Sequence, residues 1–201
     1  MDSGKLSGFL TKVGLTWNTL LRLFYALCGW LVIGTSSLIV TPIGSTPIGV
    51  LRKSLDWLAV PSLFTFDMER WCCSHLVLLN LLGFIVIAVS VFSSFEVGRS
   101  NGWNGVFTSI EAPAFLLGLL LWLQSGFAGW FIIVIFLIAW VINAFGLGIV
   151  ADFRGRFRHV VIPSDDRLFY DLFVWPATML AALLYPILVI IRLLFDGMPS
   201  K

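Results

Sequence analysis

Glu111 is the residue whose type and position offer the clearest chemistry in this sequence. It stands at the edge of residues 112–151, a run of 40 residues without an Asp, Glu, Lys, Arg or His. An apolar surrounding raises the pKa of a carboxyl group, which suits a group that carries protons. Gln124 and Asn143 are polar side chains within the run that could share the surroundings of Glu111. We therefore treat Glu111, Asn143 and Gln124 as a possible polar site.

A second interpretation of Glu111 is purely structural. Thr108 and Glu111 have the spacing of a helix capping box, in which the Thr side chain accepts a hydrogen bond from a backbone N–H and the Glu side chain reaches back. Glu111 would then only begin a short apolar helix. This interpretation is favoured, because an ionisable group buried in lipid costs on the order of 2–4 kcal/mol. The sequence leaves both roles open.

A dense basic cluster follows the same run. Arg154, Arg156 and Arg158 lie within five residues, shortly after the uncharged stretch ends. Such residues beside a membrane can bind lipid headgroups, where each charge near an anionic surface is worth roughly 1 kcal/mol. They can also contact a partner protein, or act only as a signal that sets the side of the loop. The topology signal is the favoured interpretation, and lipid-headgroup or partner contact is the alternative.

Residues 71–75, Trp-Cys-Cys-Ser-His, hold two metal-binding residue types but predict no metal site. Adjacent cysteines do not easily serve one tetrahedral site, and no second group of Cys and His residues lies elsewhere in the chain. Gly-x-Ser-x-Gly, His-Glu-x-x-His and phosphate-loop motifs are missing too. We therefore expect no metal, no cofactor and no catalytic residue, and we do not expect an enzyme.

The composition points to lipid as the main solvent of the chain. Of the 201 residues, 59% are hydrophobic and only 12% are charged, and the net charge is +2. A soluble domain carries about 25% charged residues. A charge of +2 is too small to predict a nucleic-acid partner. The sequence therefore predicts an integral membrane protein whose partners are membrane lipids and other membrane protein subunits, with no nucleic acid.

The long uncharged run must fold back within the membrane. As one helix of 40 residues it would be about 60 Å long, against about 30 Å for a bilayer core. Gln124, Ser125 and Gly126 are the polar and small residues at which we expect the turn. Residues 112–123 alone would give about 18 Å of helix, which is too short to cross. Either a helix begins near Asn104 and crosses, or this part is re-entrant.

The expected fold class is an all-α integral membrane protein in a single domain of residues 1–201. It has about five transmembrane helices plus an interfacial amphipathic helix, and the alternative is four spans and a re-entrant segment. The expected spans are approximately 20–40, 75–95, 104–124, 127–150 and 169–194. The interfacial helix is expected over 47–59, because Ile48, Leu51 and Leu55 share one helical face. That helix could equally pack on the rim of its own protein.

The distribution of basic residues sets the expected orientation. With five spans, the N-terminal side carries eight Lys and Arg residues and the other side carries five. The positive-inside rule then places the N-terminus in the cytoplasm. A re-entrant third segment changes the tally to six against seven, and the orientation is lost. We expect the bacterial inner (plasma) membrane.

These observations favour a non-enzymatic multi-pass membrane subunit that packs against other proteins in a larger assembly. Pairs of small residues at helical spacing, such as Ala114 with Gly118, are typical of close helix packing. One alternative is a small proton-coupled transporter or channel that uses Glu111. A second alternative is a lipid-modifying membrane enzyme that uses the loop from Asp152 to Asp171. Acids at a helix start explain Asp165 and Asp166 as well.

Overall fold

The computed structural model describes residues 17–35, 45–100, 110, 112–127, 130–143 and 167–196. Of residues 94–100, 167–172, 174 and 192–196 it describes the backbone only. Seven α-helices fall in these ranges, and every regular element in them is helical, which confirms the all-α prediction. The helices are α2 (Trp17–Thr35), α3 (Pro47–Trp57), α4 (Phe64–Ser74), α5 (Leu76–Ser100), α7 (Ala114–Gln124), the helix Trp130–Asn143 and α9 (Arg167–Asp196).

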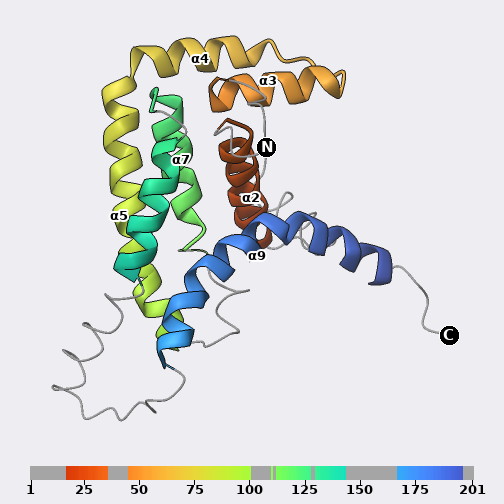
Figure 1. Cartoon of the computed structure of the whole chain (residues 1–201). Coiled ribbons are helices and arrows are strands. Elements are labelled where there is room, and N and C mark those ends of the chain that lie inside the picture. Colours follow the sequence, from red (N-terminus) through yellow and green to blue (C-terminus); the bar gives the residue numbers. More distant parts are fainter. Residues whose placement is uncertain are drawn as a thin grey trace.

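The helices form an upright group with a layer across one end. Figure 1 shows α5, α7 and the helix Trp130–Asn143 running side by side, with α2 next to them. Helices α3 and α4 form a hairpin that lies across the end of this group. Helix α9 passes along the opposite part of the bundle, and its C-terminal half extends away from it.

Two of the helices are long and apolar enough to cross a membrane. They are Trp17–Thr35 and the stretch Leu76–Ser93 of α5. Three shorter apolar helices accompany them, Ala114–Gln124, Trp130–Asn143 and Trp175–Ile191. Helix α5 continues to Ser100, past the expected end at residue 95. Once a helix is formed, each further residue adds a hydrogen bond without a new nucleation step, so a few polar residues do not end it.

The chain folds back at the predicted place. Helix α7 ends at Gln124, and the N–H of Ser125 donates to the carbonyl oxygen of Leu121 at 3.1 Å. Gly126 follows with a φ of 99°, a backbone conformation that favours glycine. The helix Trp130–Asn143 then runs back alongside α7 (Figure 1).

The start of α7 differs from the crossing helix that was expected over 104–124. Helix α7 begins at Ala114, after a turn at Ala112 and Pro113, and has 11 residues. Eleven residues span about 16 Å, roughly half of a bilayer core. Residues 101–109 and 111 lie outside the described residues, so the choice between a crossing and a re-entrant segment stays a prediction.

A helix, α3, lies where the interfacial helix was expected over 47–59, and its place at a membrane interface stays a prediction. A second helix, α4, accompanies it. Thr46 caps α3, because its side chain accepts a hydrogen bond from the N–H of Gly49 at 3.1 Å. Helix α4 was not predicted from the sequence. It joins α5 at His75, where the chain turns by a large angle (Figure 1).

Three aromatic rings from three helices fill the middle of the bundle. Trp175 of α9 is 2% exposed, and its ring centroid lies 5.1 Å from Phe115 of α7. The centroid of Phe136, in the helix Trp130–Asn143, lies 5.0 Å from Trp175. These contacts connect α9 to the fold-back, and each such pair contributes about 0.5–1.5 kcal/mol beyond the burial of its area.

Glycines let α5 and α7 touch backbone to backbone. A Cβ atom added at Gly118 would lie 3.0 Å from the carbonyl oxygen of Gly83 and 3.1 Å from the backbone nitrogen of Ile87. A Cβ atom added at Gly83 would lie 3.1 Å from the carbonyl oxygen of Gly118. The small-residue signal at Gly118 therefore marks a close helix crossing, as expected for helices in apolar surroundings.

We expect Gly118→Ala to lower the melting temperature in detergent more than Gly29→Ala does. The new methyl group at 118 would meet backbone atoms, which cannot move without separating the helices, and such overpacking costs typically about 1–3 kcal/mol. At Gly29 it would meet the end of the flexible Leu183 side chain, which can rotate away. Thermal unfolding of both purified variants makes the comparison. Equal melting temperatures would show that the backbone contact is not as tight as described.

Candidate functional site

Glu111 lies outside the described residues, but the next residue, Ala112, is buried and hydrogen-bonded. Ala112 is 2% exposed, and its carbonyl oxygen accepts a hydrogen bond from the Oγ of Ser90 at 3.0 Å. Ser90 lies in α5, within the apolar stretch Leu76–Ser93. The backbone next to Glu111 is therefore held against the apolar part of α5. The role of the Glu111 carboxyl group stays a prediction.

Gln124 caps a distant helix. It is 7% exposed, and its Oε1 accepts a hydrogen bond from the N–H of Ile48 at 3.1 Å. Ile48 is the second residue of α3, where backbone N–H groups have no partner within the helix. The amide of Gln124 thereby joins the end of α7 to the start of α3.

Asn143 lies at the other end of the fold-back. It is 2% exposed, and its Nδ2 approaches the carbonyl oxygen of Val91 at 3.4 Å. Near Gln124, by contrast, the Oγ of Ser125 donates to the Oδ1 of Asn80 at 2.6 Å. Positions 80 and 91 of α5 are about 16 Å apart along the helix axis. The structure therefore does not bring Gln124 and Asn143 together.

The remaining charged candidates cannot be placed. Arg154, Arg156, Arg158, Asp165 and Asp166 lie outside the described residues. The hypotheses of lipid-headgroup or partner contact, of a lipid-modifying enzyme and of a transporter that uses Glu111 therefore stay predictions. In the ranges that the structure describes, no group of three or more His, Cys, Asp or Glu residues is arranged to hold a metal ion.

Side chains of residues 71–75, which include Cys and His, contact one another and the nearby backbone. The ring of Trp71 stacks on that of His75 with 4.4 Å between centroids, and the Nδ1 of His75 lies 2.8 Å from the carbonyl oxygen of Trp71. Cys73 is exposed, whereas Cys72 is buried. Burial raises the pKa of the Cys72 thiol, and the nearby Cys73 and Glu69 raise it further.

Arg52 holds α3 and α4 together, a role that the sequence did not predict. Its guanidinium forms an ion pair with Glu69, and its Nε donates to the Oγ1 of Thr65 at 2.9 Å. The same group lies 3.9 Å above the centroid of the Phe66 ring. Across the loop, the Oγ of Ser62 donates to a carboxylate oxygen of Asp56 at 2.6 Å. These contacts fix the two helices to each other.

A small apolar cluster seats the hairpin on the bundle. Ile48 of α3, Cys72 of α4 and Leu79 of α5 pack together, and Leu121 of α7 packs against them. With the hydrogen bond from Ile48 to Gln124, this cluster fixes the hairpin across the end of α5 and α7. The position of the hairpin is therefore set by contacts from four helices.

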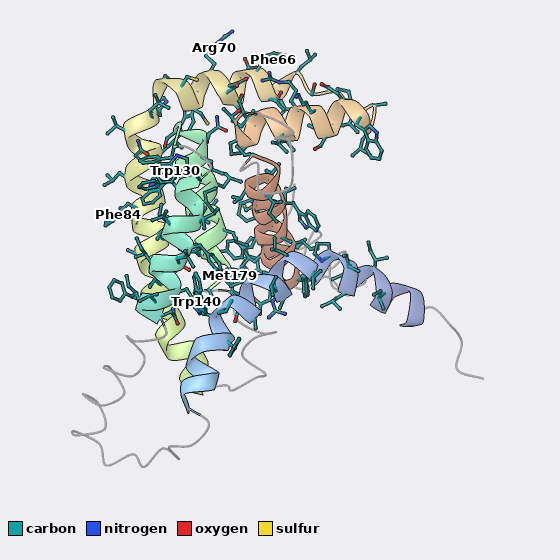
Figure 2. The ribbon with its side chains drawn as sticks, in the orientation of Figure 1. Phe66, Arg70, Phe84, Trp130, Trp140 and Met179 are labelled. Atoms are coloured by element: carbon teal, nitrogen blue, oxygen red, sulfur yellow. The ribbon has the colours of Figure 1, made fainter. Side chains whose placement is uncertain are left out.

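Large apolar side chains remain exposed on both the hairpin and the upright helices. We define the hairpin apolar surface as seven exposed residues from the end of α3, the loop and α4. Its members are Trp57, Leu58, Val60, Leu63, Phe64, Met68 and Trp71. Figure 2 shows Phe84 of α5 pointing away from the bundle, and Phe66 and Arg70 on the side of α4 that faces away from it.

The comparisons with known proteins assign no class to this arrangement. No protein-family model, no curated protein and no solved structure matches the chain.

We expect Gln124→Met to weaken the start of α3. The variant keeps an apolar stem but removes the acceptor of the Ile48 N–H, and an unsatisfied buried donor costs about 1–3 kcal/mol. Hydrogen exchange of the backbone amides of residues 48–50, followed by mass spectrometry, should become faster. Ser125→Ala is the matched control, since Ser125 bonds to Asn80 and not to α3. Unchanged exchange in Gln124→Met would contradict the capping role.

We expect N-ethylmaleimide, which enters both water and lipid, to modify Cys73 first in the folded protein. Cys73 is exposed, whereas Cys72 and Cys28 are buried, and the raised pKa of Cys72 keeps its thiol protonated at neutral pH. Mass spectrometry of labelled peptides follows the reaction. Cys73→Ser should remove the fast phase and Cys72→Ser should keep it, and the opposite pattern would contradict the described exposures.

Proposed function

We propose that the chain is a non-enzymatic multi-pass membrane subunit that packs against other membrane proteins in a larger assembly. In this proposal α2 and α5 cross the membrane, in agreement with their length and apolar composition. The observation that carries the proposal is the exposed side of α2. It bears Trp17 and Trp30, which are 72% and 50% exposed, together with Phe24 and Leu27.

The surroundings of this side of α2 support a protein neighbour. The buried residues of α2 lie on the opposite side of the helix, where Ala26, Cys28 and Val32 meet the bundle. In Figure 1 the α3–α4 hairpin and the C-terminal half of α9 both extend past α2 in the same direction. A helix of another subunit placed against α2 would contact all three elements. Such a contact suits close packing in lipid, where shape rather than the hydrophobic effect drives association.

The polar side chains of the described bundle support a structural role as well. Trp122 and Gln124 each bond to a backbone group of another helix, and Ser90 bonds to the backbone of the turn before α7. Interhelical hydrogen bonds of this kind hold helices together in lipid. They leave these groups engaged in packing rather than directed at a substrate.

Site-specific photo-crosslinking in native membranes tests this proposal. A benzophenone amino acid placed at Phe24 or Leu27 should give an adduct of one discrete higher mass. Phe84 is the matched control, because it is also an exposed Phe but points away from the bundle on α5. It should give no such adduct. The proposal fails if positions 24 and 27 give no protein adduct and the protein extracted in mild detergent is a lone monomer.

A further inference from the structure

The hairpin apolar surface has the composition of a segment that lies among lipids rather than in water. Trp57 is 83% exposed and Leu63 is 77% exposed. The loop between them, residues 58–63, contains no charged residue. Soluble surfaces do expose single apolar residues, but a continuous group of large ones marks an interaction site. The end of the hairpin therefore needs an apolar partner.

Helix α4 divides into an apolar and a polar stripe. Phe64, Met68 and Trp71 recur at spacings of four and three, which places them on one side of the helix, and all three are exposed. Asp67 lies at the edge of this stripe, three residues after Phe64. Arg70 lies on another side of the helix, four residues after the exposed Phe66, and points away from the bundle (Figure 2). A helix with this division lies in the plane of a membrane surface, with its apolar side toward the acyl chains.

The orientation of the hairpin fits that plane. Helices α3 and α4 lie across the end of the bundle (Figure 1). The chain enters the apolar stretch Leu76–Ser93 directly after His75. If α5 crosses the membrane, α4 therefore lies at the level of the headgroups. Trp71 stacks on His75 at this corner, and tryptophan is enriched at that level.

The apolar stripe continues onto α5. Val77, which is 83% exposed, follows within one turn of the corner, and Leu81 lies on the next turn of the helix. A shallow, open depression lined by Cys73, Val77 and Leu81 occupies the corner between α4 and α5. The exposed Ser74 and His75 also line this depression, so a short polar edge separates the apolar surface of α4 from that of α5. The two surfaces flank one corner, so the same acyl chains can reach both.

The charges of the hairpin exclude electrostatic attraction as the driving force. Residues 45–75 carry three basic and three acidic residues, so their formal net charge is zero with His75 neutral. Arg52 and Glu69 are paired with each other. Anionic lipids attract basic segments, and a charged partner protein would need a complementary charge. A neutral hairpin offers neither.

We infer that the hairpin apolar surface enters the boundary between headgroups and acyl chains of one leaflet, and that it does so equally in zwitterionic and in anionic membranes. This inference rests on the proposal that α5 crosses the membrane. The occupant is lipid, which apolar burial alone holds against the surface. The α3–α4 hairpin then fixes the depth of the bundle in the leaflet.

Spin labels in the reconstituted full-length chain test the inference. Single cysteines replace Leu58, Leu63, Arg70 or Phe84 in a background of Cys28→Ala, Cys72→Ala and Cys73→Ser. Labels at 58, 63 and 84 should all collide often with oxygen, which dissolves in lipid. The same three labels should collide rarely with a water-soluble nickel complex. The label at 70 should be open to nickel. The values should agree between vesicles of phosphatidylcholine alone and with phosphatidylglycerol added.

The label at 84 tests whether α5 crosses the membrane, and the labels at 58 and 63 test whether the hairpin enters the leaflet. If the label at 84 is protected but those at 58 and 63 are open to nickel, the end of the hairpin lies in water, free for a protein, and the inference is overturned. If the label at 84 is open as well, the crossing of α5 fails. If the labels at 58 and 63 are protected from nickel only when phosphatidylglycerol is present, the inference that the hairpin enters zwitterionic and anionic membranes equally is overturned.

A measurement on the nearly native chain avoids the cysteine substitutions. Wild-type protein and Trp57→Phe are compared in vesicles of brominated phosphatidylcholine, in which bromine atoms quench tryptophan fluorescence. The emission that Trp57 contributes, taken as the difference between the two proteins, should be strongly quenched by bromine near the headgroups. Absence of quenching in this difference would overturn the inference, even if the cysteine variants do not fold.

Discussion

The backbone contact between α5 and α7 is the constraint on which the rest of the molecule depends. Because Gly83 and Gly118 carry no side chain, the two helices approach until their backbone atoms touch. That distance brings side chains at both ends of the contact within reach of the opposite backbone. Ser90 then donates to the carbonyl oxygen of Ala112, and Trp122 donates to that of Asn80 at 3.0 Å. In lipid these bonds satisfy groups for which water is not available.

The same contact determines where the hairpin sits. With α7 fixed along α5, Gln124 lies at the end of the bundle and can cap α3, while Leu121 completes the cluster under Ile48. The hairpin therefore depends on α7 for its position, although 76 residues separate the two partners of the hydrogen bond. A change that separates α5 from α7 would also release the hairpin from the end of the bundle.

The sequence predicts local features of this fold well and distant ones poorly. Polar and small residues predict the turn at Gln124 to Gly126, and Pro47 predicts the start of α3 after Thr46. A long uncharged run predicts the approximate bounds of α9. Helix α4 was missed because its charges and cysteines hide an apolar stripe whose spacing is nevertheless readable. The role of Gln124 was not readable, since a cap is recognised only when its tertiary partner is known. The role of Glu111, which lies outside the described residues, stays a prediction from the sequence.

Buried polar side chains of the described bundle bond to backbone groups of neighbouring segments. In a site that moves a substrate, buried polar groups point toward one another around a common space. In the described bundle, Gln124 and Asn143 instead contact backbone atoms of other helices at levels about 16 Å apart along α5. Trp175 differs, since its Nε1 has no hydrogen-bond partner among the described residues, yet its ring is enclosed by Phe115 and Phe136. In the part of the chain that the structure describes, buried polar side chains therefore set helix positions, and large apolar side chains face outward.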